Sequence, residues 1–294
     1  MPNIHLQDFS GPVLQIMRKP VLRCAGRCSD VPGYSIKSHS HPTVELLYIV
    51  EGEGSTRVGG NAYPLAPGYL AVYNPNVEHA ETFSVGAKTP YFYHIKFDEF
   101  SISGLPVGCL LPSGMDPTFP TGSGGKDFEA LLHMLFHESA DKRLGYEQVT
   151  QGLLQCVVVL TLRQIDSRYV ALRKDKSDSL VVQIQQYLYD NYAKPLSMKD
   201  VAEEFHLNYY YFSHLFKKAL DVSPSRYLAD LRISEACRLL SNTKLTINQI
   251  AEQVGYGNQS NFQVQFKRSK GVSPMQYRAY YTENPLIFQE DRYE

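Results

Sequence analysis

The sequence predicts an α+β protein of two domains: a β-barrel with a helical pair, followed by an all-α domain of two helix-turn-helix units. Short apolar runs separated by turn signals fill about the first 112 residues, which is typical of β structure. Near the C-terminus, two stretches of helical periodicity repeat each other about fifty residues apart. The 294 residues also exceed one typical domain and suit two.

Strands are expected first, because apolar runs alternate with glycine-containing turns. The runs 44–50, 69–73 and 91–97 are rich in Val, Ile, Leu, Tyr and Phe, and the turn signals 51–54 and 67–68 separate them. Many short strands of this kind are typical of a barrel or sandwich that encloses a cavity. We therefore expect a barrel in the first part of the chain.

Two helical patterns, in 128–136 and 149–165, follow the strands. The second forms a longer apolar stripe of Val149, Leu153, Cys156, Val157, Leu160 and Ile165. Such a pair can cap its own barrel, pair with a second copy of the chain, or do both. The polar segment 173–179 has no apolar periodicity and is predicted to be a linker, so the first domain is 1–172.

The repeat defines the second domain, 180–281. Val201-Ala202-Glu203 returns as Ile250-Ala251-Glu252, and Val222-Ser223-Pro224 returns as Val272-Ser273-Pro274. A short helix, a tight turn and a second helix, duplicated, predict two helix-turn-helix units.

The second helix of each unit is predicted from its cap. Asn208 precedes a helix over 209–219, and Asn258 precedes one over 259–270. Apolar anchors face inward at helical spacing, which leaves a set of outward side chains: Tyr209, Tyr210, Ser213, His214, Lys217, Gln259, Ser260, Gln263, Val264 and Lys267.

A helix that begins at Ser223-Pro224 connects the two units. Its roughly 16 residues form a strut about 24 Å long. A strut of that length can hold two reading helices about one turn of DNA, ~34 Å, apart.

Charge is spread unevenly. Residues 180–281 carry 12 Lys and Arg against 8 Asp and Glu, a net charge of +4. Residues 1–179 have a net charge of −2, and the acidic tail 282–294 has −3. This distribution favours nucleic-acid binding by the middle segment alone.

The five cysteines form no pair of C-x-x-C motifs, and free thiols in a reducing cytoplasm are expected. The first residues lack the charged and apolar regions of a signal peptide, and no apolar run reaches about 18 residues. A cytoplasmic protein without a membrane span is therefore predicted.

Residues 180–281 resemble the DNA-binding domain of the AraC/XylS family of bacterial transcription regulators. Matching motifs include Phe216-Lys217-Lys218, Ser223-Pro224-Ser225-Arg226-Tyr227-Leu228, Arg232-Ile233-Ser234-Glu235-Ala236, Ile250-Ala251-Glu252-Gln253-Val254-Gly255-Tyr256 and Gly271-Val272-Ser273-Pro274. The resemblance covers about a hundred residues, and it implies double-stranded promoter DNA as a partner.

By this resemblance, base-reading positions are held by Tyr210, Ser213 and His214 in the first unit and by Gln259, Ser260, Gln263 and Val264 in the second. Lys217, Lys218, Lys267 and Arg268 would hold phosphates. Two residues depart from the family pattern. Asp221 stands at a usual glycine, which predicts a looser helix end, and Val264 replaces a frequent polar reader.

The first domain resembles the cupin superfamily. Gly33-x5-His39-x-His41-x3-Glu45-x6-Gly52 matches the first cupin metal motif, and a second segment from Pro67 to His79 resembles the second motif with Asn76 at its usual glycine. Three imidazoles and one carboxylate can hold Mn, Fe, Ni or Zn, which makes the candidate metal ligands His39, His41, Glu45 and His79. Hydrogen bonding to an organic ligand, with no cofactor required, is the alternative role.

Tyrosines and charged groups in the predicted strands suit a small polar molecule held by stacking and convergent hydrogen bonds. The predicted effector site consists of His39, His41, Glu45, Tyr73, His79, Tyr93 and His94. Arg23, Arg57 and Lys96 offer further charge. Regulators of the resembled kind often sense sugars, so the resemblance implies a carbohydrate effector.

These features predict a cytoplasmic, dimeric transcription regulator and not an enzyme. The regulator is expected to bind promoter operators, with RNA polymerase as a further partner if it activates transcription. The rivals are a cupin metalloenzyme, such as a dioxygenase or isomerase, and a metal-sensing regulator, both built on the cupin histidines. Neither G-x-S-x-G nor G-x-x-x-x-G-K-[ST] occurs. The effector, the operator and the sign of regulation stay open.

Overall fold

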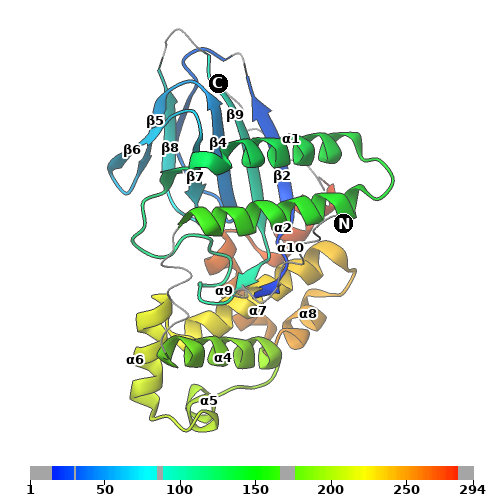
Figure 1. Cartoon of the computed structure of the whole chain (residues 1–294). Coiled ribbons are helices and arrows are strands. Elements are labelled where there is room, and N and C mark those ends of the chain that lie inside the picture. The colour runs from blue at the N-terminus through cyan, green and yellow to red at the C-terminus, as the bar shows by residue number, and fades with distance from the viewer. Residues whose placement is uncertain (1–14, 30, 85–88, 166–175, 284–294) are drawn as a thin grey trace, which may run out of the picture.

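The computed structural model describes residues 15–29, 31–84, 89–165 and 176–283 (Figure 1). Antiparallel strands with two covering helices form the N-terminal part, and further helices form the C-terminal part beneath it. This arrangement confirms the predicted α+β class. Among the described helices, none has the length and apolar character that a bilayer crossing requires.

Five strands form the larger antiparallel sheet: β2 (Val21–Cys28), β4 (Val44–Glu51), β7 (Tyr69–Tyr73), β9 (Tyr91–Asp98) and β11 (Thr118–Pro120). Their order is β11-β7-β4-β9-β2. The apolar runs 44–50, 69–73 and 91–97 are therefore three adjacent strands, as predicted, with Leu46 opposite Ile95.

Four strands form the second sheet: β3 (Ser35–His39), β5 (Gly54–Val58), β6 (Asn61–Leu65) and β8 (His79–Phe83). Their order is β3-β8-β5-β6. Gly59 and Gly60 connect β5 to β6 with φ of 57° and 85°, a conformation that glycine adopts at no steric cost. Two short strands, β1 (Ile16–Arg18) and β10 (Ser101–Ile102), pair with each other.

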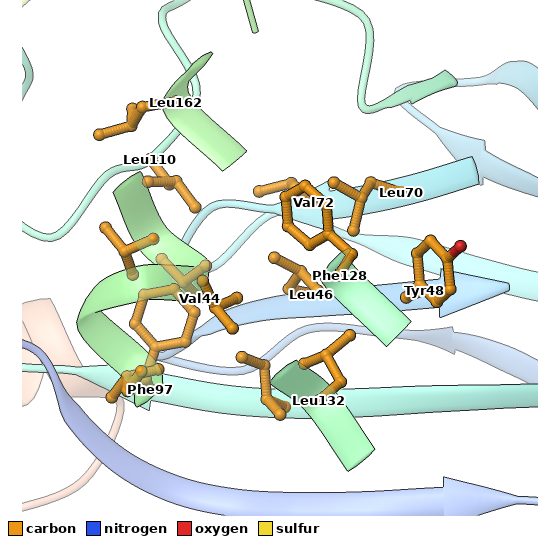
Figure 2. Packing of buried hydrophobic residues seen from close by; sticks show 14 of the residues in the cluster. Val44, Leu46, Tyr48, Leu70, Val72, Phe97, Leu110, Phe128, Leu132 and Leu162 are labelled. Carbon is orange, nitrogen blue, oxygen red and sulfur yellow. The ribbon is translucent and has the colours of Figure 1, made fainter. Parts of the chain in front are cut away.

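Successive side chains of the larger sheet point alternately to its two faces, which have different surroundings. On β9, Tyr93, Ile95 and Phe97 belong to a core that also contains apolar side chains of the two covering helices (Figure 2). His94 and Lys96 point to the other face, because successive strand residues alternate. The helix-facing side of the sheet is thus apolar. The side that faces the second sheet carries these polar groups together with a second apolar cluster that includes Leu47, Ile49 and Phe92.

The covering helices are α1 (Gly125–Asp141) and α2 (Tyr146–Ile165), both near their predicted positions. Phe128 and Leu132 of α1 pack against Tyr48 and Leu46 in the core (Figure 2). In the predicted apolar stripe of α2, Leu153, Val157 and Ile165 are buried in this same core. Most of that stripe therefore caps its own barrel.

Within the described residues 176–283, the C-terminal part consists of seven helices: α4 (Lys176–Asn191), α5 (Met198–Glu204), α6 (Tyr209–Leu220), α7 (Pro224–Asn242), α8 (Ile247–Gln253), α9 (Gln259–Lys270) and α10 (Pro274–Glu283). Helix α4 begins inside the predicted linker 173–179, and the positions before it from 166 on lie outside the described residues. The tail from 284 on also lies outside them.

The predicted caps form hydrogen bonds at each helix start. Ser197, Asn208, Thr246 and Asn258 accept hydrogen bonds from backbone N–H groups two or three residues ahead. Ser223 does the same for α7, with Pro224 at the first helical position. Local sequence therefore determines where the helices of both units start.

The C-terminal part packs against the barrel through polar contacts. Arg18 of β1 pairs with Glu235 of α7 and donates to Ser234 Oγ at 3.1 Å. Gln185 of α4 is fully buried; its Oε1 accepts from Gly104 N at 2.8 Å, and its Nε2 donates to Leu105 O at 3.1 Å. Buried polar groups that are paired in this way define one docked arrangement.

Candidate DNA-binding surface and cupin-type site

The two recognition helices, α6 and α9, present their predicted readers to solvent. Phe212 and Phe216 anchor α6, and Phe262 and Phe266 anchor α9; all four are fully buried. The opposite faces carry the predicted set Tyr209, Tyr210, Ser213, His214, Lys217, Gln259, Ser260, Gln263, Val264 and Lys267, of which Ser213 is half-buried and the others are exposed. The packing of the described residues thus leaves these side chains free for a partner.

The turn before each recognition helix has a left-handed corner. His206 has φ of 55°, and Gly255, its counterpart in the second unit, has φ of 85°. A Cβ on Gly255 would lie 2.8 Å from the carbonyl oxygen of Ala193 and 2.9 Å from that of Tyr192. Glycine is therefore required in the second turn by both its φ and the close approach of another backbone.

Asp221, where a looser helix end was predicted, forms the same kind of cap as Gly271. Asp221 takes φ of 57° and donates its N–H to Lys217 O, and Gly271 takes φ of 76° and donates to Lys267 O. Both recognition helices therefore end in the same cap. Aspartate adopts the left-handed conformation more readily than most other residues with a side chain.

Exposed cations cluster at the C-terminal ends of both recognition helices. Lys217 and Lys218 lie in the last turn of α6, and Lys267 and Arg268 lie in the last turn of α9. These positions suit contacts with phosphate oxygens.

The four predicted metal ligands come together between the two sheets. His39 ends β3, His41 follows it, Glu45 lies on β4 and His79 begins β8. One donor atom from each lies within 4.8 Å of the other three. Glu45 Oε2 is 2.7 Å from His41 Nε2 and 3.3 Å from His79 Nε2.

Each of the three imidazoles is oriented by a backbone carbonyl. Nδ1 of His39 lies 3.1 Å from Lys37 O, that of His41 lies 3.0 Å from Thr43 O, and that of His79 lies 2.8 Å from Val77 O; all are two residues away. A carbonyl oxygen only accepts, so Nδ1 donates in each case and a neutral ring then carries its lone pair on Nε2. Histidines that bind a metal through one ring nitrogen commonly donate the other ring N–H to a carbonyl or carboxylate in this way.

That tautomer leaves two acceptors facing each other. In that tautomer, Nε2 of His41 and Oε2 of Glu45 are both hydrogen-bond acceptors, and they lie 2.7 Å apart. Two acceptors at this distance repel each other unless a proton or a cation lies between them. A second proton on the imidazole satisfies the pair, and so does a divalent cation. The donor set of three nitrogens and one carboxylate oxygen fits a transition metal.

Glu45 is the anionic centre of the cluster. Its burial opposes ionisation, but hydrogen bonds from His41 and His79 and the charge of Lys96 hold the pKa of Glu45 well below its usual range. Lys96 Nζ lies 3.6 Å and His94 Nδ1 lies 3.9 Å from Glu45 Oε1. Four basic side chains therefore surround one carboxylate.

Sequence reasoning missed a second polar group beside this cluster. Glu81 lies on β8 directly opposite Thr56 of β5, and its carboxylate is 3.8 Å from His79 Nε2. Burial, then the charge of Glu45, raise the pKa of Glu81 to about 7. The two-residue spacing from His79 places both side chains on one face of β8, a signal the sequence did contain.

One oxygen each of Thr56, Tyr73 and Glu81 is buried without a completed hydrogen bond among the described residues. The ring of Tyr73 stacks on His79 with centroids 3.9 Å apart. Burial, with Glu81 nearby, raises the pKa of Tyr73 well above its usual value. Thr56 and Glu81 both influence the Tyr73 hydroxyl, so the three oxygens form one buried polar group.

Of the predicted effector residues, His39, His41, Glu45, Tyr73, His79 and His94 lie in or beside the cluster. Tyr93 does not. It lies on the helix-facing side of β9, near His133 and Phe136 of α1, because it alternates with His94. Arg23 is also elsewhere, paired with Asp98 and Glu99 at the end of the barrel that faces the helices of the C-terminal part.

Comparisons with known proteins match both parts of the chain. The family model described as "Helix-turn-helix domain" matches residues 201–280, and the model described as "Cupin domain" matches residues 26–91. The helix-turn-helix model is of AraC type.

Several curated proteins resemble the chain over most of its length. The "Uncharacterized HTH-type transcriptional regulator YfiF" of Bacillus subtilis (strain 168) is 26% identical over 259 residues, covering 86% of this chain and 82% of the relative. The "Lactose operon transcription activator" of Staphylococcus xylosus is 25% identical over 246 residues, with 81% and 85% covered. Among solved structures, fatty-acid-bound ToxT of Vibrio cholerae matches with a TM-score of 0.47 and 12% identity, covering 88% of this chain and 95% of its own.

Proposed function

We propose that the chain is an AraC-type helix-turn-helix regulator with a cupin domain, and that it binds promoter DNA through α6 and α9 under the control of a small molecule held in the barrel. Its relatives are transcription regulators and not enzymes. Its compartment is then the bacterial cytoplasm, where the DNA lies.

One observation carries the proposal for DNA. Helices α6 and α9 are each anchored by two buried phenylalanines, while Tyr210 and Gln259 on their opposite faces are exposed. A capped helix with amide, hydroxyl and phenol groups outward and cations at its end has the chemistry of a major-groove reader.

Selection from a random-sequence duplex library with the full-length chain tests the proposal. We expect one enriched motif with two protected segments in a footprint, about one helical turn apart. The proposal would be contradicted if the wild type enriched no motif. It would also be contradicted if the double variant Gln259→Ala/Tyr210→Ala enriched the same motif as the wild type.

The effector proposal is a sugar bound next to Glu45. Its support is the group of polar side chains there, His94, Lys96 and Tyr73, together with the name of the Staphylococcus xylosus relative as a lactose operon activator. Thermal unfolding of the full chain with a panel of sugars tests it, because a ligand of the folded state raises the midpoint. The matched variant Tyr73→Phe keeps the ring and removes the hydroxyl. A panel in which no sugar shifts the midpoint counts against the proposal.

A metal-responsive regulator is the second candidate, favoured by the three carbonyl-oriented imidazoles. His39, His41, Glu45 and His79 would hold the ion, and it would supply a Lewis-acidic contact for an effector oxygen. Metal content of the purified chain and of His79→Ala, with DNA affinity before and after chelation, tests this role. Stoichiometric metal in the wild type and a DNA affinity that changes on chelation would favour metal sensing. A metal-free protein whose DNA affinity is unchanged by chelation would rule it out.

We also propose a homodimer through the outer face of α2, where Val149, Gly152 and Cys156 are exposed. No charged residue occurs between Glu147 and Arg163, which leaves an uncharged face suited to a second copy. Sedimentation at micromolar concentration should show a dimer for the wild type and a monomer for Val149→Lys. A monomeric wild type would remove the proposal. RNA polymerase is a further partner if the protein is an activator.

A further inference from the structure

The two helix-turn-helix units have separate hydrophobic cores that share helix α7. Tyr227 and Leu231, in its first half, belong to the core of the first unit, with α4, α5 and α6. Ile233 and Ala236, in its second half, belong to the core of the second unit, with α8 and α9. Arg232 lies between these two sets, so it stands at the seam where the cores meet.

The guanidinium of Arg232 contacts both units at once. Its Nε donates to Tyr192 O at 2.8 Å, and its terminal nitrogen donates to Lys194 O at 2.8 Å. Both carbonyls follow the end of α4 at Asn191 and belong to the first unit. The guanidinium carbon also lies 5.6 Å from the ring centroid of Tyr256, in the turn of the second unit.

The backbones of the two units meet at the same place. Gly255, next to Tyr256, approaches the carbonyl oxygens of Ala193 and Tyr192 so closely that a Cβ would lie 2.8–2.9 Å from them. A planar side chain with a fixed fork of donors therefore bridges a seam that has no room for an added methyl group.

We propose that Arg232, supported by Gly255, is a positioning residue that holds α6 and α9 at one relative orientation and so sets the spacing between the two DNA segments that they read. The inference rests on the proposed DNA binding. Helix α7 alone is one rod between two cores, and twisting at its middle would move one reading helix against the other. Two hydrogen bonds and a cation–π contact from one rigid group oppose that motion.

The first test uses duplexes selected by the wild-type full-length chain, and derivatives with one or two base pairs inserted between the two footprints. Wild type should lose most of its affinity on insertion. Arg232→Gln should bind the parent duplex about 10- to 100-fold more weakly, because two loosely joined units engage their DNA segments simultaneously less often. Its affinity should fall less than that of wild type on insertion, because loosely joined units tolerate more spacings between the segments. Arg232→Lys should behave similarly, since lysine keeps the charge and lacks the fork.

Arg226→Gln is the matched control, because Arg226 lies on the same helix and bonds Asp230 within it. It should keep the wild-type dependence on spacing. An insertion penalty in Arg232→Gln equal to that of wild type, with or without a uniform loss of affinity, would overturn the inference.

A second measurement needs no DNA. Nitroxides attached to non-natural residues at Glu203 and Glu252, exposed counterparts in α5 and α8, report the distance between the units and spare the native cysteines. We expect one narrow distance in wild type and Arg226→Gln, and a broad distribution in Arg232→Gln and Gly255→Ala. An unchanged distribution in Arg232→Gln would overturn the positioning role, whereas failure of the wild type to select DNA would overturn only the proposed function.

Discussion

Arg18, on the first described strand, forms an ion pair with Glu235 in the middle of α7. Glu235 also accepts from Arg238 at 2.6 Å, and Ser234 beside it accepts from Arg18. Both partners of the pair are largely buried. The helix that joins the two DNA-reading units is therefore attached directly to the barrel.

The first prediction concerns this attachment. Arg18→Met should lower the free energy of unfolding by about 1–3 kcal/mol, because it removes a charge-assisted partner from a buried carboxylate that keeps only Arg238. Urea unfolding of the full chain measures the change. Arg57→Met, at an exposed side chain of β5, is the matched control and should change stability little. Equal stability of the two variants would show that the pair contributes nothing.

A second prediction is a pH dependence that arises from Glu99. Burial, then the charge of Asp98, raise the pKa of Glu99 to about 7, although Arg23 and Arg18 lie near it and Lys270 adds charge. Between about pH 4.5 and 7 the folded protein holds a proton that the unfolded chain has released, so stability falls as pH rises through this range.

Glu99→Gln should remove that part of the slope, which is at most about 3 kcal/mol. Comparing unfolding free energies of wild type and variant at about pH 5 and about pH 8 isolates it, since other titrating groups are common to both. Parallel pH profiles for the two proteins would contradict the prediction.

Gln259→Ala should relax base preference in the operator. Gln259 begins α9 and is exposed, where its amide can accept from and donate to the edge of adenine. The loss should be about 1–3 kcal/mol at one base pair, with other positions unchanged. Affinities for a set of single-base operator variants measure it. If preference at every position stays the same, Gln259 reads no base.

Lys267→Ala should weaken binding to all sequences alike. Lys267 lies in the exposed last turn of α9, where a cation suits a phosphate contact. Removing one such contact should flatten the dependence of log affinity on log salt by about 0.9. Titrations at several salt concentrations measure the slope, and Lys244→Ala, exposed outside the recognition helices, is the control. An unaltered slope would rule out a phosphate contact.

Gly26→Ala should disturb the barrel site from outside the ligand set. A Cβ on Gly26 would lie 1.9 Å from His94 Nε2, so the imidazole that approaches Glu45 would have to move. We expect a stability loss of about 1–3 kcal/mol from overpacking and a smaller thermal shift with any ligand of the site. His94→Ala in the Gly26→Ala background should restore stability. Failure to do so would show that the clash lies elsewhere.

Local signals explain how well the C-terminal domain could be predicted. The caps Ser197, Asn208, Thr246 and Asn258 act within three residues, so sequence alone locates each helix start. His39, His41 and Glu45 were predictable from their short spacing, which runs from the end of β3 into β4. His79, on β8, was predictable only through the resemblance of its segment to the second cupin motif.

The errors concern features that depend on distant neighbours. Tyr93 was placed in the barrel site because nothing in the run 91–97 shows which face of the strand meets α1. Arg18, Gln185 and Glu235 gave no signal, since polar residues that pair across domains look like surface residues in the sequence. Glu81 was overlooked although its two-residue offset from His79 was visible.

The corners at His206 and Gly255 differ in what surrounds them, although they share a backbone conformation. Gly255 faces the carbonyls of Tyr192 and Ala193, whereas the corner at His206 already carries an exposed side chain. A chimaera built from two copies of the first unit would carry a histidine at that contact and could not close it. The two helix-turn-helix units are therefore not interchangeable. The turn of the first unit tolerates a side chain at His206, whereas the turn of the second unit has no room for one at Gly255.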